Sequence, residues 1–330
     1  MRSKFMRTVL SALTMAAALA GQSAFAADKL VVYTSQPSDQ MQSVLDLFKK
    51  VQPTIEVELF RSGTTEVLNK LTAEVAAGDP KADVLLIADS VAMADIKRQN
   101  MLMPYKEANV SALPKGQYDP DMTFFGTKFI TTGIMYNTKS GKPKPSSWND
   151  LLKPEAKGQV VLPSPLYSGA AMIQVATIAE QPSFGWSYWE KLSKNGAVAA
   201  QGNGNVNDAV SRGDKAYGII IEYMAFGQQA KGSPVEFIFP TEGVTVINQP
   251  VAILKTAKNV ASAKKFVDFQ LSKEAQEQSV GQAYFPLIKG VQPPKGYPDP
   301  STLKVIEADP SVLMNKMEET KKKFADLYGG

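Results

Sequence analysis

The sequence predicts an α/β fold made of two units, and three observations lead to this class. Removal of the first 26 residues leaves about 304 of the 330, more than one hydrophobic core usually supports. Apolar, β-branched runs alternate with stretches of helical periodicity, as in doubly wound α/β domains. Apolar residues make up 44% of the chain and charged residues 21%, so there are enough apolar side chains for two cores.

The first unit shows strands and helices in alternation. Residues 30–34, 55–60 and 83–87 are rich in Val, Leu and Ile and predict strands. Residues 38–50 and 66–77 repeat apolar side chains at helical spacing and predict the intervening helices. Ligands of such folds bind at the carboxyl edge of the sheet, so residues that directly follow these strands are candidates for a site.

A second α/β unit follows along the chain. Residues 159–162 and 216–221 predict buried strands, and residues 244–254 predict a further extended segment. Helices are expected over 170–180 and 184–194. The chain thus contains two units of the same class.

The first 26 residues have the pattern of a signal peptide. A basic start is followed by an apolar run over 8–21, and Ala24-Phe25-Ala26 forms a small-x-small cleavage site. The run is shorter than the ~20 residues that a membrane span needs. We therefore expect cleavage after about Ala26 and a mature protein in the periplasm.

Composition excludes several classes of function. The chain has no histidine and no cysteine, which removes Ser-His-Asp and Cys-His nucleophiles, the usual zinc sites and disulfides. The formal charge of +4 includes three cations of the signal peptide, so the mature chain carries about +1, which disfavours nucleic acid as a partner. We expect a protein without catalysis or a cofactor. A secreted enzyme that uses two carboxylates is the alternative from another class.

Several segments together resemble the periplasmic solute-binding proteins of ABC importers. The resemblance is strongest to the binders of ferric ion, thiamine, sugar phosphate and 2-aminoethylphosphonate, and it covers the whole mature chain. The segments that carry it are Leu30–Ser35, Ala82–Leu85, Gly133–Asn137, Ser146–Leu152, Phe266–Phe269 and Leu271–Gln276.

This resemblance implies a type II periplasmic binding protein fold, in which crossover strands join two lobes around a ligand cleft. Lobe one is expected to combine 27–128 with about 249–300. Lobe two is expected to combine about 129–248 with about 301–330. It also implies a monomer that closes on a small anionic solute by hinge motion and delivers it to an inner-membrane permease.

Three turns before helices are candidates for holding an anion, because backbone N–H groups and the positive end of the dipole meet there. The candidate residues are Ser35 in the first turn, Ser62, Thr64 and Thr65 in the second, and Ser168, Gly169 and Ala170 in the third. The ordinary alternative is that Ser and Thr merely cap these helices. The third turn matches the one that holds phosphate in ferric-binding relatives.

Two further clusters complete the predicted site. Glu222 and Tyr223 end an apolar strand where ferric-binding relatives carry two adjacent tyrosines, so the resemblance implies a metal site that has lost a ligand. Asn203 and Asn205 occur in a glycine-rich segment that relatives place against the ligand; its alternative is a surface loop. Asp89 follows the third strand and is a weaker candidate.

These residues predict a receptor for a small phosphate- or phosphonate-bearing solute, such as 2-aminoethylphosphonate or a sugar phosphate. Glu222 would then read the cationic or hydroxylated end. The first alternative is ferric iron with a synergistic anion, bound by Tyr223, Glu222 and Glu66. Thiamine or its phosphate is a further alternative, which requires aromatic walls in the cleft.

Overall fold

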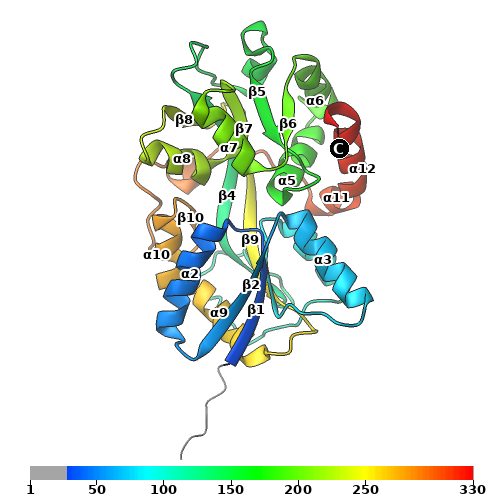
Figure 1. Ribbon diagram of the computed structural model, residues 1–330, viewed down its shortest axis with the longest axis vertical. Coiled ribbons are helices and arrows are strands. Elements are labelled where there is room, and N and C mark those ends of the chain that lie inside the picture. The colour runs from blue at the N-terminus through cyan, green and yellow to red at the C-terminus, as the bar shows by residue number, and fades with distance from the viewer. Residues whose placement is uncertain (1–27, 330) are drawn as a thin grey trace, which may run out of the picture.

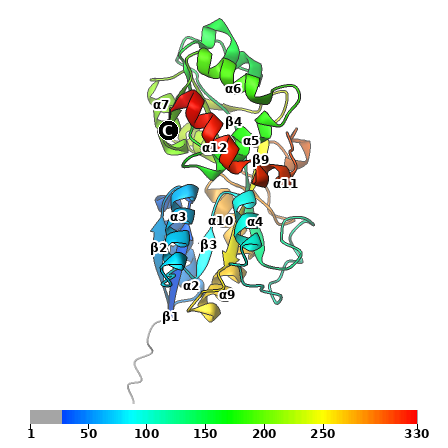
Figure 2. The same ribbon diagram turned by 90° about the vertical axis from the view of Figure 1, so that its right-hand side faces the viewer.

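The computed structural model describes residues 28–329 and arranges them in two lobes, one above the other (Figures 1 and 2). The strands form one continuous mixed sheet of ten strands that runs through both lobes and is flanked by helices, so the predicted two-lobed α/β fold class is confirmed. The predicted signal peptide lies outside the described residues. Within the described part of the chain, no helix combines the length and the apolar character needed to cross a bilayer.

The first lobe, at the bottom of Figure 1, contains the parallel strands β2, β1 and β3 in that order. Its helix α2 turns Met41, Val44 and Phe48 into the core, as the helical spacing predicts. The elements of this lobe are β1 (Asp28–Thr34), α2 (Ser38–Val51), β2 (Ile55–Arg61), α3 (Thr64–Ala76), β3 (Val84–Leu86), α4 (Ser90–Arg98), α9 (Val260–Gln270), α10 (Lys273–Gly281) and β10 (Phe285–Pro286).

The second lobe is built around strands β7, β5 and β6, which are parallel to one another. Helix α12 packs against α5 and α6, whereas α11 also contacts α4 of the first lobe. The elements of this lobe are β5 (Val160–Pro163), α5 (Gly169–Ala179), α6 (Gly185–Lys194), β6 (Val198–Ala200), α7 (Asn203–Arg212), β7 (Tyr217–Ile221), α8 (Glu222–Ala230), β8 (Val235–Ile238), α11 (Pro310–Asn315) and α12 (Met317–Tyr328).

Two long strands join the lobes. Strands β4 (Phe124–Asn137) and β9 (Thr245–Ile253) run antiparallel through the middle of the molecule (Figure 1). Their pairing shifts register between Gly126 and Phe129, so the ladder is interrupted at mid-height. Such an irregularity is where a ribbon bends most easily. The residue limits of the two lobes stay a prediction.

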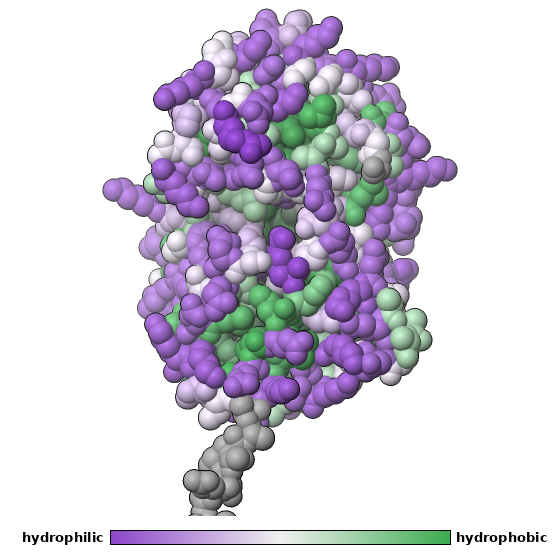
Figure 3. All heavy atoms as spheres, in the orientation of Figure 1, coloured by the Kyte–Doolittle hydropathy of each residue, from purple (hydrophilic) through white to green (hydrophobic). Residues whose placement is uncertain are grey.

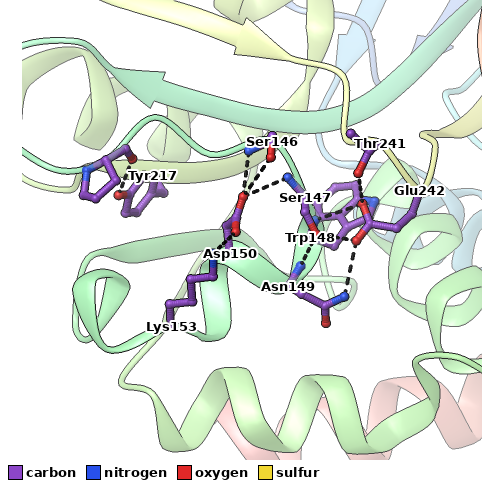
Figure 4. Close-up of polar contacts among 10 residues, drawn as sticks. Ser146, Ser147, Trp148, Asn149, Asp150, Lys153, Tyr217, Thr241 and Glu242 are labelled. Atoms are coloured by element: carbon purple, nitrogen blue, oxygen red, sulfur yellow. Dashed lines mark hydrogen bonds and ion pairs between the residues drawn. The ribbon is translucent and has the colours of Figure 1, made fainter.

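The Ser146–Leu152 segment of the family resemblance supports the second lobe. Its 3-10 helix η1 (Trp148–Leu152) starts with a capping box, in which Ser147 Oγ accepts from the Asn149 N–H at 3.1 Å. Glu242 accepts from the Trp148 N–H at 3.3 Å (Figure 4). The fully buried Trp148 indole donates to the Gly243 carbonyl at 2.9 Å. Replacing such a buried Trp by Ala typically costs about 3–5 kcal/mol. The motif therefore marks packing.

Three helix starts depart most from the sequence analysis. Helix α3 begins at Thr64, not Glu66. Helix α7 begins at Asn203, within the glycine-rich segment for which a surface loop was the alternative. Helix α8 begins at Glu222, directly where β7 ends, although the sequence suggested only a strand end there. The sequence prediction relied on the spacing of apolar residues. The first turns of α3 and α7 contain mainly polar residues and glycine, so the spacing did not show where these helices begin.

Candidate ligand-binding site

A cavity of about 150 Å³ lies between the two lobes. On the face of the molecule drawn in Figure 3, the lobes meet along a recess at mid-height. Seven of the predicted site residues line this cavity: Ser35, Thr64, Ser168, Ala170, Asn203, Asn205 and Tyr223. The second and third predicted turns, which come from different lobes, therefore face one cavity.

Four predicted site residues lie outside the cavity wall. Thr65 and Gly169 line an adjoining pocket of about 50 Å³ that also includes Asp89. Ser62 donates a hydrogen bond to Glu66 on the surface. Glu222 is fully buried behind the wall.

The amino ends of five helices meet at the cavity. The residue preceding each of α2, α3, α5, α7 and α8 is part of the wall, and these N-cap residues are Pro37, Gly63, Ser168, Gly202 and Ile221. Each N-terminus carries about half a positive charge and several unpaired N–H groups. Their convergence favours a negatively charged group in the cavity.

Most of these helix starts lack a side chain that satisfies their N–H groups. Within the described residues, Pro37, Gly63, Gly202 and Ile221 make no side-chain capping bond. Only Ser168 caps its own helix, by accepting from the Ala171 N–H at 3.2 Å. Uncapped N–H groups that face a cavity leave donors for a ligand oxygen.

Asn203 links three of the helix starts. It is the first residue of α7, and its Nδ2 donates to Ser168 Oγ at 3.1 Å. Its Oδ1 accepts from the Ile221 N–H at 3.4 Å. Asn203 thereby fixes the starts of α5, α7 and α8 relative to one another, which explains why it is buried.

Arg61 is the charged residue that the sequence analysis missed. It ends β2 and is the only charged side chain in the cavity wall formed by the described residues. Its Nε donates to the Gln36 carbonyl at 3.2 Å, which orients the guanidinium. A lone arginine at the end of an exposed edge strand carries no local pattern, so only the fold reveals its place.

The structure corrects the role expected for Glu222. One carboxylate oxygen accepts from the Thr131 N–H of β4 at 2.6 Å, and the other has no hydrogen-bond partner among the described residues. Burial raises the pKa of Glu222 to about 8, so the side chain is largely protonated at neutral pH. The Glu222 side chain cannot contact the cationic end of a solute in the cavity, because it is buried in the protein interior at the start of α8.

The iron site expected from Tyr223, Glu222 and Glu66 is not assembled either. Tyr223 is the only member of this set in the cavity wall. Burial raises the pKa of its phenol, which opposes formation of a phenolate ligand. Among the described residues, no three Asp, Glu, His or Cys side chains gather closely enough to hold a metal ion.

Comparison with known proteins defines the class. Residues 79–310 match the family model described as bacterial extracellular solute-binding protein. The chain belongs to this family, whose members are transport receptors rather than enzymes. It is a periplasmic solute-binding protein of the kind that serves ABC importers.

The names of particular relatives refer to different solutes. The chain is 28% identical to the Fe(3+)-binding periplasmic protein of Serratia marcescens, over 81% of both chains. It is 24% identical to a Salmonella typhimurium periplasmic protein named for 2-aminoethylphosphonate, over 71% of this chain and 70% of that one. The structure of AfuA from Actinobacillus pleuropneumoniae with fructose 6-phosphate has a TM-score of 0.82 at 25% identity, and the match covers 91% of this chain and 98% of AfuA.

Proposed function

We propose that this chain captures a small phosphate- or phosphonate-bearing solute between its lobes and delivers it to an inner-membrane permease. One observation carries the proposal: five helix N-termini and the guanidinium of Arg61 face one cavity whose wall, among the described residues, contains no carboxylate. Oxyanions are the ligands that such a set of donors and dipoles favours.

The size of the cavity limits the solute. A volume of about 150 Å³ holds a molecule of roughly the size of benzene. Inorganic phosphate, 2-aminoethylphosphonate and a three-carbon sugar phosphate are closest to this size. A hexose phosphate or thiamine requires lobes that close less completely.

The remaining wall disfavours a second charge on the solute. Asn205, Thr64 and the phenols of Tyr167 and Tyr223 offer neutral hydrogen-bonding groups, whereas Glu222 is turned away. We therefore expect a hydroxylated or other uncharged tail to bind more tightly than an ammonium of equal length.

Isothermal titration calorimetry on the mature protein tests this function. The panel consists of inorganic phosphate, glycerol 3-phosphate, 2-aminoethylphosphonate and fructose 6-phosphate, with glycerol as the uncharged control. We expect heat from the small phosphorylated solutes and none from glycerol. Absence of heat from all four anions would reject the proposal.

Incubation with ferric iron tests the alternative function of iron binding. A tyrosinate–iron(III) complex absorbs visible light, so protein incubated with ferric citrate and then desalted is examined by absorption spectroscopy. We expect a colourless protein with unchanged phosphate binding. A visible band that requires Tyr223, lost in Tyr223→Phe, would instead favour the ferric function.

A further inference from the structure

Two glycines make reciprocal contacts across the cleft. Gly63, the N-cap of α3 in the first lobe, lies against Tyr167 of the second lobe: a Cβ built on Gly63 would be 2.6 Å from the Tyr167 carbonyl oxygen and 2.7 Å from its ring. Gly169, which begins α5 in the second lobe, lies against the first lobe. Its Cβ would be 2.7 Å from the Asp89 Cβ and 2.9 Å from the Ala88 carbonyl oxygen.

Backbone conformation does not explain either glycine. Gly63 has φ −62° and ψ 156°, which any residue adopts, and Gly169 is a helical residue without positive φ. The requirement for glycine therefore comes from the close approach of the other lobe. Since atoms at ordinary contact lie at least 3.4 Å apart, a methyl group at either position forces the lobes apart.

The contact at Gly63 also positions Tyr167 over the cavity. The Thr65 N–H donates to the Tyr167 carbonyl at 3.4 Å, which joins the two lobes directly. On its other side, the Tyr167 ring lies against Gly202, where a Cβ would be 2.9 Å from two ring carbons. Tyr167 is thus held between one glycine of each lobe and forms part of the cavity wall.

We propose that Gly63 and Gly169 are positioning residues that permit full closure, and that Tyr167 is the latch that retains the solute once the lobes have closed. The retention part rests on the proposed function, whereas the closure part does not. A methyl group at position 63 should leave solute association in the open form nearly unchanged. It should speed dissociation, because the closed form is lost.

The chain offers a graded set of variants for the test. Gly63→Ala is expected to raise the dissociation rate of inorganic phosphate about 10- to 100-fold, as overpacking against backbone atoms does. Gly202→Ala should have a smaller effect, since the facing atoms belong to a ring that can move. Gly227→Ala is the matched control: Gly227 lies in α8 outside the cavity wall, and nothing lies within 4 Å of its Cβ.

Closure is measured separately from binding. The chain contains no cysteine, so spin labels can be attached solely at Thr72→Cys on α3 and Glu190→Cys on α6, both exposed positions on different lobes. Pulsed electron paramagnetic resonance then gives the distribution of distances between the two spin labels, with and without phosphate. Unchanged thermal melting of Gly63→Ala confirms that the variant folds.

The outcomes separate the two proposals. A short-distance population in the parent protein that Gly63→Ala lacks supports the closure part of the proposal, even where no anion of the panel binds. The latch is rejected if Gly63→Ala closes and releases phosphate like the parent. It is also rejected if the parent shows no short-distance population under any condition.

Discussion

The two walls of the cavity achieve the same electrostatic result by different means. The second-lobe wall presents the starts of α5, α7 and α8, which the Asn203 side chain connects. The first-lobe wall presents the starts of α2 and α3 together with the charge of Arg61. One wall is a cradle of backbone amides that the Asn203 side chain connects, and the other adds the cationic side chain of Arg61.

This difference predicts an order of binding. A cradle whose parts are already fixed binds an anion without prior closure, since it loses little conformational freedom. The first lobe then contributes Arg61 and the contact of Gly63 with Tyr167. Changes in the second-lobe wall should therefore weaken the initial encounter, whereas changes in the first-lobe wall should mainly accelerate release.

Asn205→Asp is expected to have the largest effect on affinity. The new carboxylate lies in the first turn of α7, where it favours the helix dipole, so the fold should be retained. Its repulsion of a bound anion should lower affinity about 10- to 100-fold, with slower association. Stopped-flow kinetics measures this, and Asn109→Asp on an exposed loop is the control of equal charge. Unchanged association would contradict the proposed order of binding.

Arg61→Gln should lower the affinity for phosphate about 10-fold, which is the usual contribution of one charge-assisted hydrogen bond. The loss should occur in the dissociation rate and should shrink the dependence of affinity on salt concentration. Arg61→Lys should recover part of the loss. Arg98→Gln, a surface arginine paired with Asp95, serves as the control. If Arg61→Gln changed only the association rate, the proposed difference between the two cavity walls would be rejected.

Glu222→Gln is expected to change phosphate affinity less than about 2-fold, because the side chain lies behind the cavity. Its effect should appear in stability. The folded pKa of about 8 exceeds the ordinary value of 4.5, so Glu222 loses its stabilising contribution as pH rises from about 4.5 to 8. The melting temperature of Glu222→Gln relative to the parent should therefore rise between pH 5 and pH 8. Exposed Glu190→Gln is the control, and a flat difference would show that the carboxyl is not buried as described.

Local pattern was sufficient for the scaffold and for part of the site. Apolar periodicity predicted most strands and helices. The turn at Ser168–Ala170 indicated one helix start whose backbone N–H groups could hold an anion. Asn203 and Asn205, which line the cavity, were proposed because glycine and amide side chains cluster there. In each case, the signal lay within a few neighbouring residues.

The remainder of the site depends on tertiary placement. Pro37 and Ile221 are far apart in the chain, yet both precede helices that point into one cavity. Arg61 and Tyr167 have no sequence context that separates them from other surface residues. Glu222 was misplaced because a one-residue difference between the end of a strand and the start of a helix reverses the direction of the side chain.

The interrupted ladder between β4 and β9 has a consequence beyond the cleft. Because the lobes are joined by a paired ribbon rather than by a loose linker, the proposed closure on a solute would change the outline of the whole molecule in one reproducible direction. A permease that contacts both lobes at once could then distinguish the solute-bound protein from the empty one by its shape, without contacting the solute.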